Sequence, residues 1–152
     1  MSKSEIRNAE AHDDPLAKSL LHLLHRAGQT ADELFAREMK ATHLTPRQFA
    51  VLVVLARAET ASQTAIVDAT GIDRSTSAEI VKRLVDRGLL ARRRSKLDAR
   101  AYAVKLTAEG QAVLKQAVPI ASRLEESLLA ALPSVYRSAI LQGLAAMTKN
   151  PT

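Results

Sequence analysis

The segment TGIDRSTSAEIVKRLVDRG, residues 70–88, restricts the fold more than any other part of this chain. Asp73 stands where a helix N-cap is expected, just after Gly71, a residue suited to reversing the chain after an earlier helix. The apolar residues of the segment fall on one helical face: Ile80, Val81, Leu84 and Val85. Gly88 then ends the pattern. The segment therefore predicts a helix that packs one face on a core and follows a tight turn.

Two further helices are predicted upstream of this segment. Thr45 with Gln48 predicts a capping box before a mostly apolar helix, and Thr60 with Gln63 predicts another before a short helix that reaches Ala69. Two short helices joined by a tight, glycine-containing turn form a helix-turn-helix unit. We therefore expect the 60–69 helix and the helix that begins at Asp73 to form such a unit.

Two short strands follow the predicted unit. Residues 89–94 and 101–106 have the composition and alternation of strands, and the charged sequence SKLDAR joins them as a hairpin tip. A two-stranded hairpin is marginal by itself, so this hairpin must pack on the helices. The predicted fold is mainly α with a small β-hairpin wing, a winged helix-turn-helix over residues 44–106.

Long helical patterns flank this module on both sides. One runs from residue 13 to 41 with Asp13 or Asp14 as its start, and another runs from Thr107 to about residue 131, with a kink expected at Pro119. A last helix starts at Pro133. We predict that 13–43 and 107–152 form a helical dimerisation region, continuous with the module in one domain, after a flexible arm over 1–12. An unusually padded monomer is the alternative.

Composition limits the function further. Lys and Arg number 22 against 16 Asp and Glu, giving a net charge of +6, which suits a polyanionic partner. The chain has no cysteine, and no apolar run reaches the length of a membrane helix. Because no signal core or catalytic fingerprint occurs, we expect a cytoplasmic protein that is not an enzyme and needs no cofactor.

The outward face of the 73–88 helix and the wing carry the residues expected to contact DNA. Hydroxyls near a helix N-terminus and basic side chains suit phosphates, and Glu79 can accept from cytosine or instead form a salt bridge with Arg83. Asp98 is expected to orient Arg100 at the wing tip. The predicted DNA contacts are Arg74, Ser75, Thr76, Ser77, Glu79, Lys82, Arg83, Arg92, Arg93, Arg94, Lys96, Asp98 and Arg100.

These segments, taken in order, resemble the MarR family of bacterial transcription regulators. The most specific part is D-x-R followed by a strand and L-T-x-x-G, and the helix-turn-helix adds a second signature; the matching residues are Asp98, Arg100, Leu106, Thr107, Gly110, Gly71, Asp73, Arg74, Ser75, Thr76, Leu84, Gly88 and Leu89. The resemblance implies a homodimer on a short inverted-repeat operator, loosened by a small molecule. Many members carry a Ser/Thr-Arg pair where this chain has Ala78 and Glu79, which predicts a different operator preference.

The resemblance also implies an effector cavity between the flanking helices and the DNA-binding module. An apolar lining with basic anchors suits an aromatic carboxylate or its CoA thioester. The segments TPRQFAVL and RRRSKLDARAYAV also resemble family members that control aromatic-acid breakdown. The candidates are Leu20, His22, Leu24, His25, Arg26, His43, Arg47, Phe49, Leu52 and Val53. His22 and His25 alone do not predict a metal site. The sequence thus predicts a ligand-released repressor; an architectural DNA-binding protein without an effector is the alternative.

Overall fold

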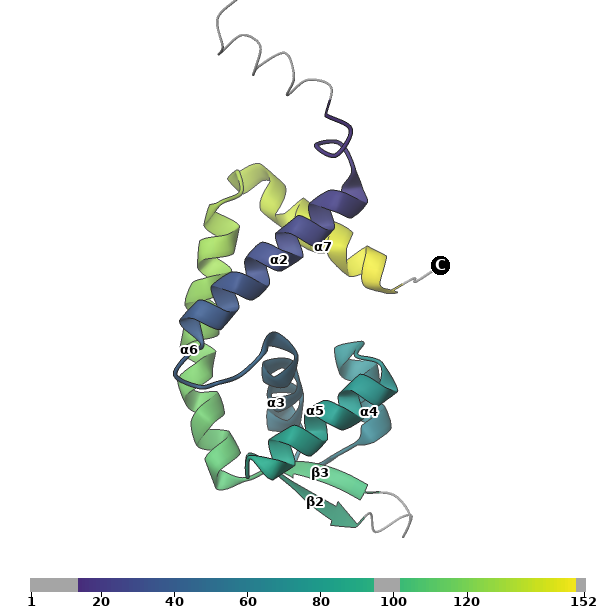
Figure 1. Cartoon of the computed structure of the whole chain (residues 1–152), viewed down its shortest axis with the longest axis vertical. Helices are drawn as coiled ribbons and strands as arrows, with labels where there is room; N and C mark the ends of the chain where they lie inside the picture. Colours follow the sequence, from purple (N-terminus) through teal and green to yellow (C-terminus); the bar gives the residue numbers. More distant parts are fainter. Residues whose placement is uncertain (1–13, 95–101, 150–152) are drawn as a thin grey trace, which may run out of the picture. The chain divides into compact units, whose positions relative to one another are not determined.

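The computed structural model describes residues 14–94 and 102–149, and the chain divides into two compact units, Met1–Leu34 and Phe35–Thr152. The predicted fold class is confirmed, because helices dominate and a small antiparallel sheet forms the wing (Figure 1). The predicted arm at 1–12 lies outside the described residues.

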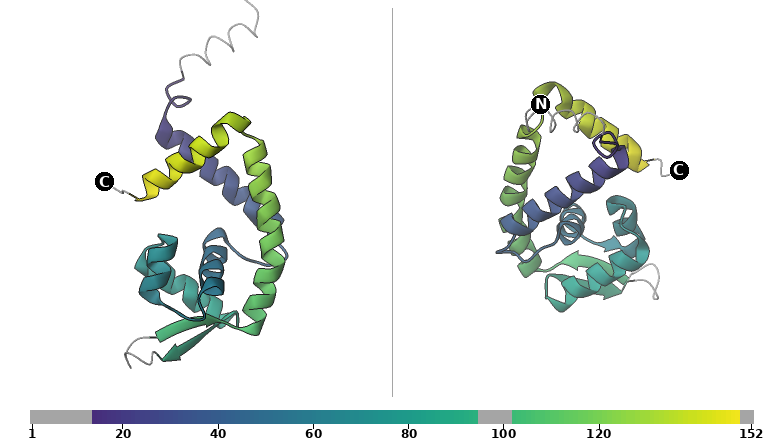
Figure 2. Two further views of the ribbon diagram at one scale, coloured as in Figure 1. Left: turned by 180° about the vertical axis from the view of Figure 1, so that it is seen from behind. Right: turned by 45° about the horizontal axis from the view of Figure 1, so that its top comes forward.

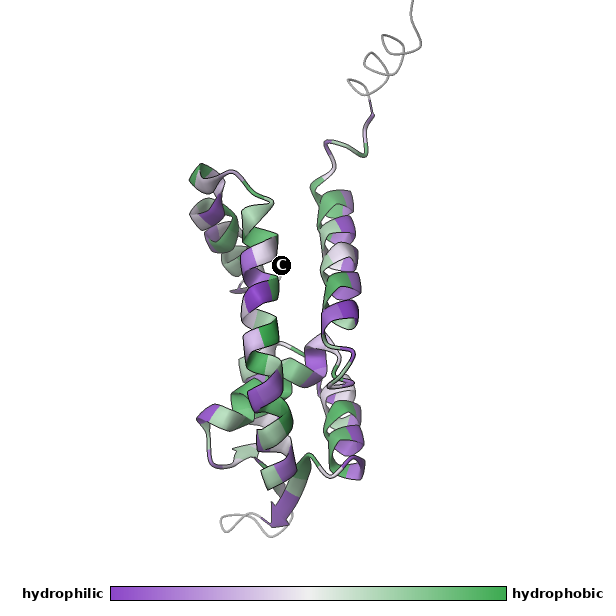
Figure 3. Cartoon of the chain, turned by 90° about the vertical axis from the view of Figure 1, so that its left-hand side faces the viewer, coloured by the Kyte–Doolittle hydropathy of each residue, from purple (hydrophilic) through white to green (hydrophobic). Residues whose placement is uncertain are grey.

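The first described helix, α2 (Leu20–Glu38), is shorter than its apolar pattern predicted. Asp14 does not start it: its carboxylate accepts from the backbone N–H of Leu16 at 2.9 Å, which holds a local turn. The backbone N–H of His22 instead donates to the hydroxyl of Ser19 at 3.2 Å, so the helix begins after Ser19. Along α2, apolar residues follow one side and hydrophilic residues the other (Figure 3).

Three helices build the core of the winged module. They are α3 (Pro46–Arg57), α4 (Gln63–Thr70) and α5 (Arg74–Asp86). The capping box of Thr45 and Gln48 is confirmed, as are the turn at Gly71, whose φ is 68°, and the Asp73 cap.

The capping box predicted for Thr60 is wrong. Ser62 is the N-cap of α4, and its hydroxyl accepts from the backbone N–H of Ala65 at 3.1 Å. The residues just before this cap are extended rather than helical, because Ala61 and Ser62 form the short strand β1. The α4 helix therefore begins later than Thr60 would allow.

The wing contains a strand that sequence patterning missed. The predicted strands are present as β2 (Leu90–Arg94) and β3 (Tyr102–Leu106), but β1 pairs antiparallel with the free edge of β3, giving the order β1-β3-β2. Ala61 pairs with Val104 and is buried. Because β1 has two residues, it shows no alternation that a sequence reading could detect.

The hydrophobic core lies between the three module helices, the sheet and the long helix that follows it. Figure 1 shows α3, α4 and α5 gathered on one side of β2 and β3. Side chains with almost no exposure come from each of these helices and include Val51, Leu52, Ile66, Val81 and Leu84. The module is thus held by the burial of aliphatic side chains.

The base of the wing packs tightly against the first turn of α6 (Ala108–Ala130). The Thr107 hydroxyl donates to the carbonyl oxygen of Gly88 at 2.6 Å and accepts from the backbone N–H of Gly110 at 3.0 Å. A Cβ on Gly110 would overlap the backbone carbonyl of Leu89. Glycine is therefore required here by close approach, while Gly88, with φ 74°, is required by conformation.

Helix α6 runs from the wing base to α7 (Ser134–Lys149) (Figure 2). Pro119 lies inside α6, and the helix is assigned on both sides of it. No residue of α7 is buried. Within the described residues, no single helix is long and apolar enough to cross a membrane; α6 and α7 meet the test only together, with a 115° bend between them.

We predict that Gly110→Ala destabilises the protein by about 1–3 kcal/mol, because the added methyl group must displace the Leu89 backbone. Urea denaturation followed by circular dichroism measures this. Gly28→Ala is the matched control: no atom lies within 4 Å of its added Cβ, and helix propensity should raise stability by up to about 1 kcal/mol. Equal stabilities for the two variants would contradict the close approach.

Candidate nucleic-acid interface

Helix α5 separates its buried and outward faces as the sequence predicted. Ile80, Val81 and Leu84 are buried in the module core. The polar side chains on the opposite face are exposed: Arg74, Ser75, Glu79, Lys82 and Asp86. This face has the length and the donor groups to enter a DNA major groove.

Asp73 organises the start of α5. Its carboxylate accepts from the backbone N–H of Thr76 at 2.9 Å and from the hydroxyl of Ser75 at 2.8 Å. Hydrogen bonding from the side chain of Thr76, then from its backbone and from Ser75, lowers the pKa of Asp73 from 3.8 to about 2. The hydroxyls of Ser75 and Thr76 therefore serve the cap, and their free capacity toward a ligand is as acceptors.

Arg74 joins the two helices of the helix-turn-helix unit. Its guanidinium donates to the hydroxyl of Thr64 in the first turn of α4 at 3.0 Å. Both side chains are exposed. The contact holds the Arg74 guanidinium at a fixed place between the starts of α4 and α5. A phosphate there can accept hydrogen bonds from the remaining N–H groups of the guanidinium.

Ser77 does not belong to the exposed face. Its side chain is fully buried, and its hydroxyl has no hydrogen-bond partner within the described residues. The prediction that Ser77 donates to DNA is therefore wrong. Its position on the helix places it with Ile80, Val81 and Leu84, so the residue fills space in the core.

Glu79 forms the salt bridge that was its alternative reading. Its carboxylate lies 3.5 Å from the Arg83 guanidinium, and both side chains are more than half exposed, so the pair adds little stability. Beside this pair is a groove of about 470 Å³ between α5 and the first turn of α3. Arg47, predicted as an effector residue, lines this groove together with Ser75 and Thr76.

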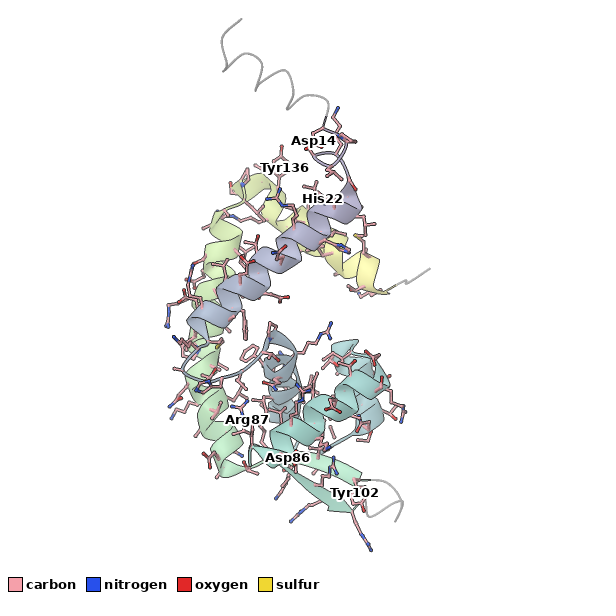
Figure 4. All side chains as sticks on the ribbon, viewed as in Figure 1. Asp14, His22, Asp86, Arg87, Tyr102 and Tyr136 are labelled. Atoms are coloured by element: carbon pink, nitrogen blue, oxygen red, sulfur yellow. The ribbon has the colours of Figure 1, made fainter. Side chains whose placement is uncertain are left out.

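The wing presents consecutive basic side chains. Arg92, Arg93 and Arg94 are all exposed on β2, opposite Val104, Ala103 and Tyr102 of β3. Tyr102 is exposed near the outer end of the wing (Figure 4). The tip residues Lys96, Asp98 and Arg100 lie outside the described residues.

Arg87 fastens the end of α5 to the loop before α3 (Figure 4). Its guanidinium donates to the carbonyl oxygens of Thr42 and His43, each at 3.0 Å. His43 has a positive φ of 52°, which a non-glycine residue adopts at a cost. The contact fixes the end of α5 relative to this loop. The sequence pattern gave no sign of it, because Arg87 looks like any other surface charge in the sequence.

The predicted effector residues fall in both compact units, and each group is described by itself. On α2, His22 and Leu24 are half-buried, whereas Leu20, His25 and Arg26 are exposed. In the second unit, Phe49 and Val53 are half-buried, His43 is exposed, and the Phe49 ring lies 5.9 Å from that of Phe35.

Leu52 is completely buried, so its expected place in a cavity wall is wrong and it belongs to the core. A pocket of about 600 Å³ does occur in the second unit, between the end of α3 and the first half of α6. None of the predicted effector residues lines it. Within the described residues, no group of three His, Asp or Glu side chains could hold a metal ion.

Comparison with known proteins places the chain in a family. Residues 44–101 match the MarR family. The transcriptional repressor NicR of Pseudomonas putida is 33% identical over 120 residues, covering 79% of this chain and 76% of NicR. This chain belongs to the MarR family of transcriptional regulators.

Two solved structures are similar over nearly the whole chain. BpsR of Bordetella bronchiseptica, whose DNA binding is regulated by 6-hydroxynicotinic acid, has a TM-score of 0.83 at 32% identity, covering 89% of this chain and 96% of BpsR. The repressor CouR, bound to a 23-mer DNA duplex, has a TM-score of 0.79 at 34% identity, covering 87% of this chain and 94% of CouR. The similarity therefore includes the helices on both sides of the winged module.

We predict that the Asp73 carboxylate stabilises the fold at neutral pH and loses this effect in acid. Its folded pKa of about 2 is below the ordinary 3.8, so the stabilisation is complete above about pH 4 and declines as the pH falls toward 2. Urea denaturation of the wild type and of Asp73→Asn, which keeps an acceptor oxygen, should give a stability difference that shrinks over this range. A difference independent of pH would contradict the assignment.

Proposed function

We propose that this protein is a dimeric, ligand-responsive repressor that binds a short inverted-repeat operator and is released by a small molecule. It acts in the cytoplasm by binding, not by catalysis. The carrying observation is the combination of an α5 face that is polar and exposed with a wing whose three successive arginines are exposed. These two surfaces suit a major groove and the adjacent backbone of one duplex.

The proposed DNA interface draws on both elements. On α5 it comprises Arg74, Ser75, Thr76, Glu79, Lys82 and Arg83, without Ser77. On the wing it comprises Arg92, Arg93 and Arg94, with Lys96, Asp98 and Arg100 added from the sequence. Arg83 is held toward Glu79, so the pair presents a donor and an acceptor side by side, which can read a base pair.

The helices on either side of the module support association of two copies. Tyr136, Ile140, Leu144 and Met147 recur at helical spacing on α7, and all four are exposed in the single chain. We call these four residues the α7 stripe. Leu16, Leu20, Leu21 and Leu23 are exposed in the first unit. We propose that residues 13–43 and 107–152 form the dimerisation region and 44–106 the DNA-binding module, because a two-fold dimer presents two α5 helices to two half-sites.

The proposed effector is an aromatic acid or its CoA thioester. Support comes from the likeness to BpsR, whose DNA binding responds to 6-hydroxynicotinic acid, and from the basic and imidazole side chains near apolar residues on α2. His22 is half-buried on α2, which suits a polar anchor at the edge of an apolar site. The residues that hold the effector stay a prediction.

The test is a DNA-binding titration at fixed, near-physiological salt. The probes are the segment upstream of this protein's own gene and a scrambled duplex of equal length, each with 6-hydroxynicotinic acid, other aromatic acids and their CoA thioesters. We expect a preference of about 10³ or more for the upstream segment, reduced by one compound. Equal affinity for both duplexes, unaffected by every compound, would support an architectural protein instead.

We predict that Leu144→Glu converts the dimer to a monomer, because it places a carboxylate in the α7 stripe. Sedimentation equilibrium measures the mass, and DNA titration should show the loss of operator preference. The matched control is Gln142→Glu, which adds the same charge on the exposed polar side of α7. A Leu144→Glu protein with the mass of the wild type would show that this stripe is not the dimer interface.

A further inference from the structure

We infer that Arg47 is a DNA-backbone contact outside the helix-turn-helix, binding a phosphate in the groove between α3 and α5; this rests on the proposed DNA-binding function. The groove has a volume of about 470 Å³. One wall is the first turn of α3, with Thr45 and Arg47, and the other is the outer part of α5, with Glu79 and Arg83.

The electrostatics of this groove favour an anion. Across the described ranges 14–94 and 102–149, carboxylate partners within 4.0 Å are found for Arg37 and Arg83, and Arg47 has none. Glu79, the acidic residue of the groove, is already paired with Arg83. The exposed guanidinium of Arg47 therefore carries a positive charge that nothing in the groove neutralises.

The hydroxyl groups of the groove are neutral donors, and two of the three already donate to the Asp73 carboxylate. Ser75 donates to the Asp73 carboxylate at 2.8 Å, and hydrogen bonding from the Thr76 side chain helps lower the pKa of the same carboxyl group. The Thr45 hydroxyl accepts from the backbone N–H of Gln48 at 3.2 Å as the cap of α3, which leaves its single neutral O–H as a donor. A phosphate in the groove would therefore find its charged, unpaired donor in the Arg47 side chain, which can offer two parallel N–H groups.

DNA geometry brings a phosphate to this place. An α-helix with its side chains is about 10–12 Å across and the major groove is about 12 Å wide, so both sugar-phosphate backbones pass close along the sides of α5. The groove at Arg47 lies along one of these sides. The positive end of the α3 dipole adds to the attraction at the same point.

The reassignment changes what the loss of Arg47 should do. As an effector anchor, which the sequence suggested, it would matter for ligand response and not for DNA affinity. If Arg47 contacts a phosphate, its loss would weaken binding to every duplex alike, because phosphates carry no sequence information. The salt dependence would also change, since each phosphate neutralised contributes about 0.9 to the slope of log K against log salt.

The experiment compares Arg47→Gln, Arg47→Lys and the matched control Arg57→Gln by titrating the upstream and scrambled duplexes over a series of salt concentrations. Arg57 is exposed on the last turn of the same helix, about 15 Å away along its axis. Thermal unfolding checks that all three variants fold, which we expect because both side chains are exposed.

We expect Arg47→Gln to weaken binding to both duplexes by a similar factor and to reduce the salt slope by about 1 per half-site. Arg47→Lys should retain the slope because it keeps the charge, and Arg57→Gln should match the wild type. An unchanged slope in Arg47→Gln overturns the inference, and loss of ligand response alone would return Arg47 to the effector site. A wild-type protein without duplex preference would instead count against the proposed function.

Discussion

The contact between Gly110 and the Leu89 carbonyl sets the position of nearly everything that contacts DNA. Close to this point in the structure, α5 ends at Asp86, the wing strand β2 begins at Leu90 and α6 begins at Ala108. Thr107 joins them by donating to Gly88 and accepting from Gly110. The L-T-x-x-G motif thus has a physical reason: threonine ties the helix end to the new helix, and glycine lets the two backbones meet. The wing arginines are directed by this junction, and not only by their own strand.

Elements with strong local signals could be predicted from the sequence, and elements defined by tertiary contacts could not. The Thr45 and Gln48 box, the Asp73 cap and the glycine turns depend on neighbouring residues, so their patterns were sufficient. The short β1 strand exists because Ala61 pairs with Val104, which is distant in sequence. It displaced the expected Thr60 cap to Ser62. The predicted bounds of α2 were too long, because the apolar spacing continues across a turn that the Asp14 carboxylate stabilises.

The candidate site shows the same division. Helical periodicity predicted which side chains of α5 are exposed. Ser77 was wrongly included among the DNA contacts, because a serine is polar by residue type even where its side chain is buried. Leu52 was misplaced for the opposite reason, since a leucine in a wholly apolar helix can face a cavity or the core. Arg47 and Arg87 differ from other surface arginines only in what stands opposite them: a groove beside α5 in one case, and two loop carbonyls in the other.

The exposure of α7 has a consequence for how the protein responds to its own abundance. A helix with no buried residue in one chain can bury its apolar side chains by association, so assembly of two copies stabilises it. If operator binding requires the assembled pair, occupancy rises with the square of subunit concentration wherever free subunits predominate. A modest change in synthesis would then switch the operator more sharply than independent subunits could, before any ligand is bound.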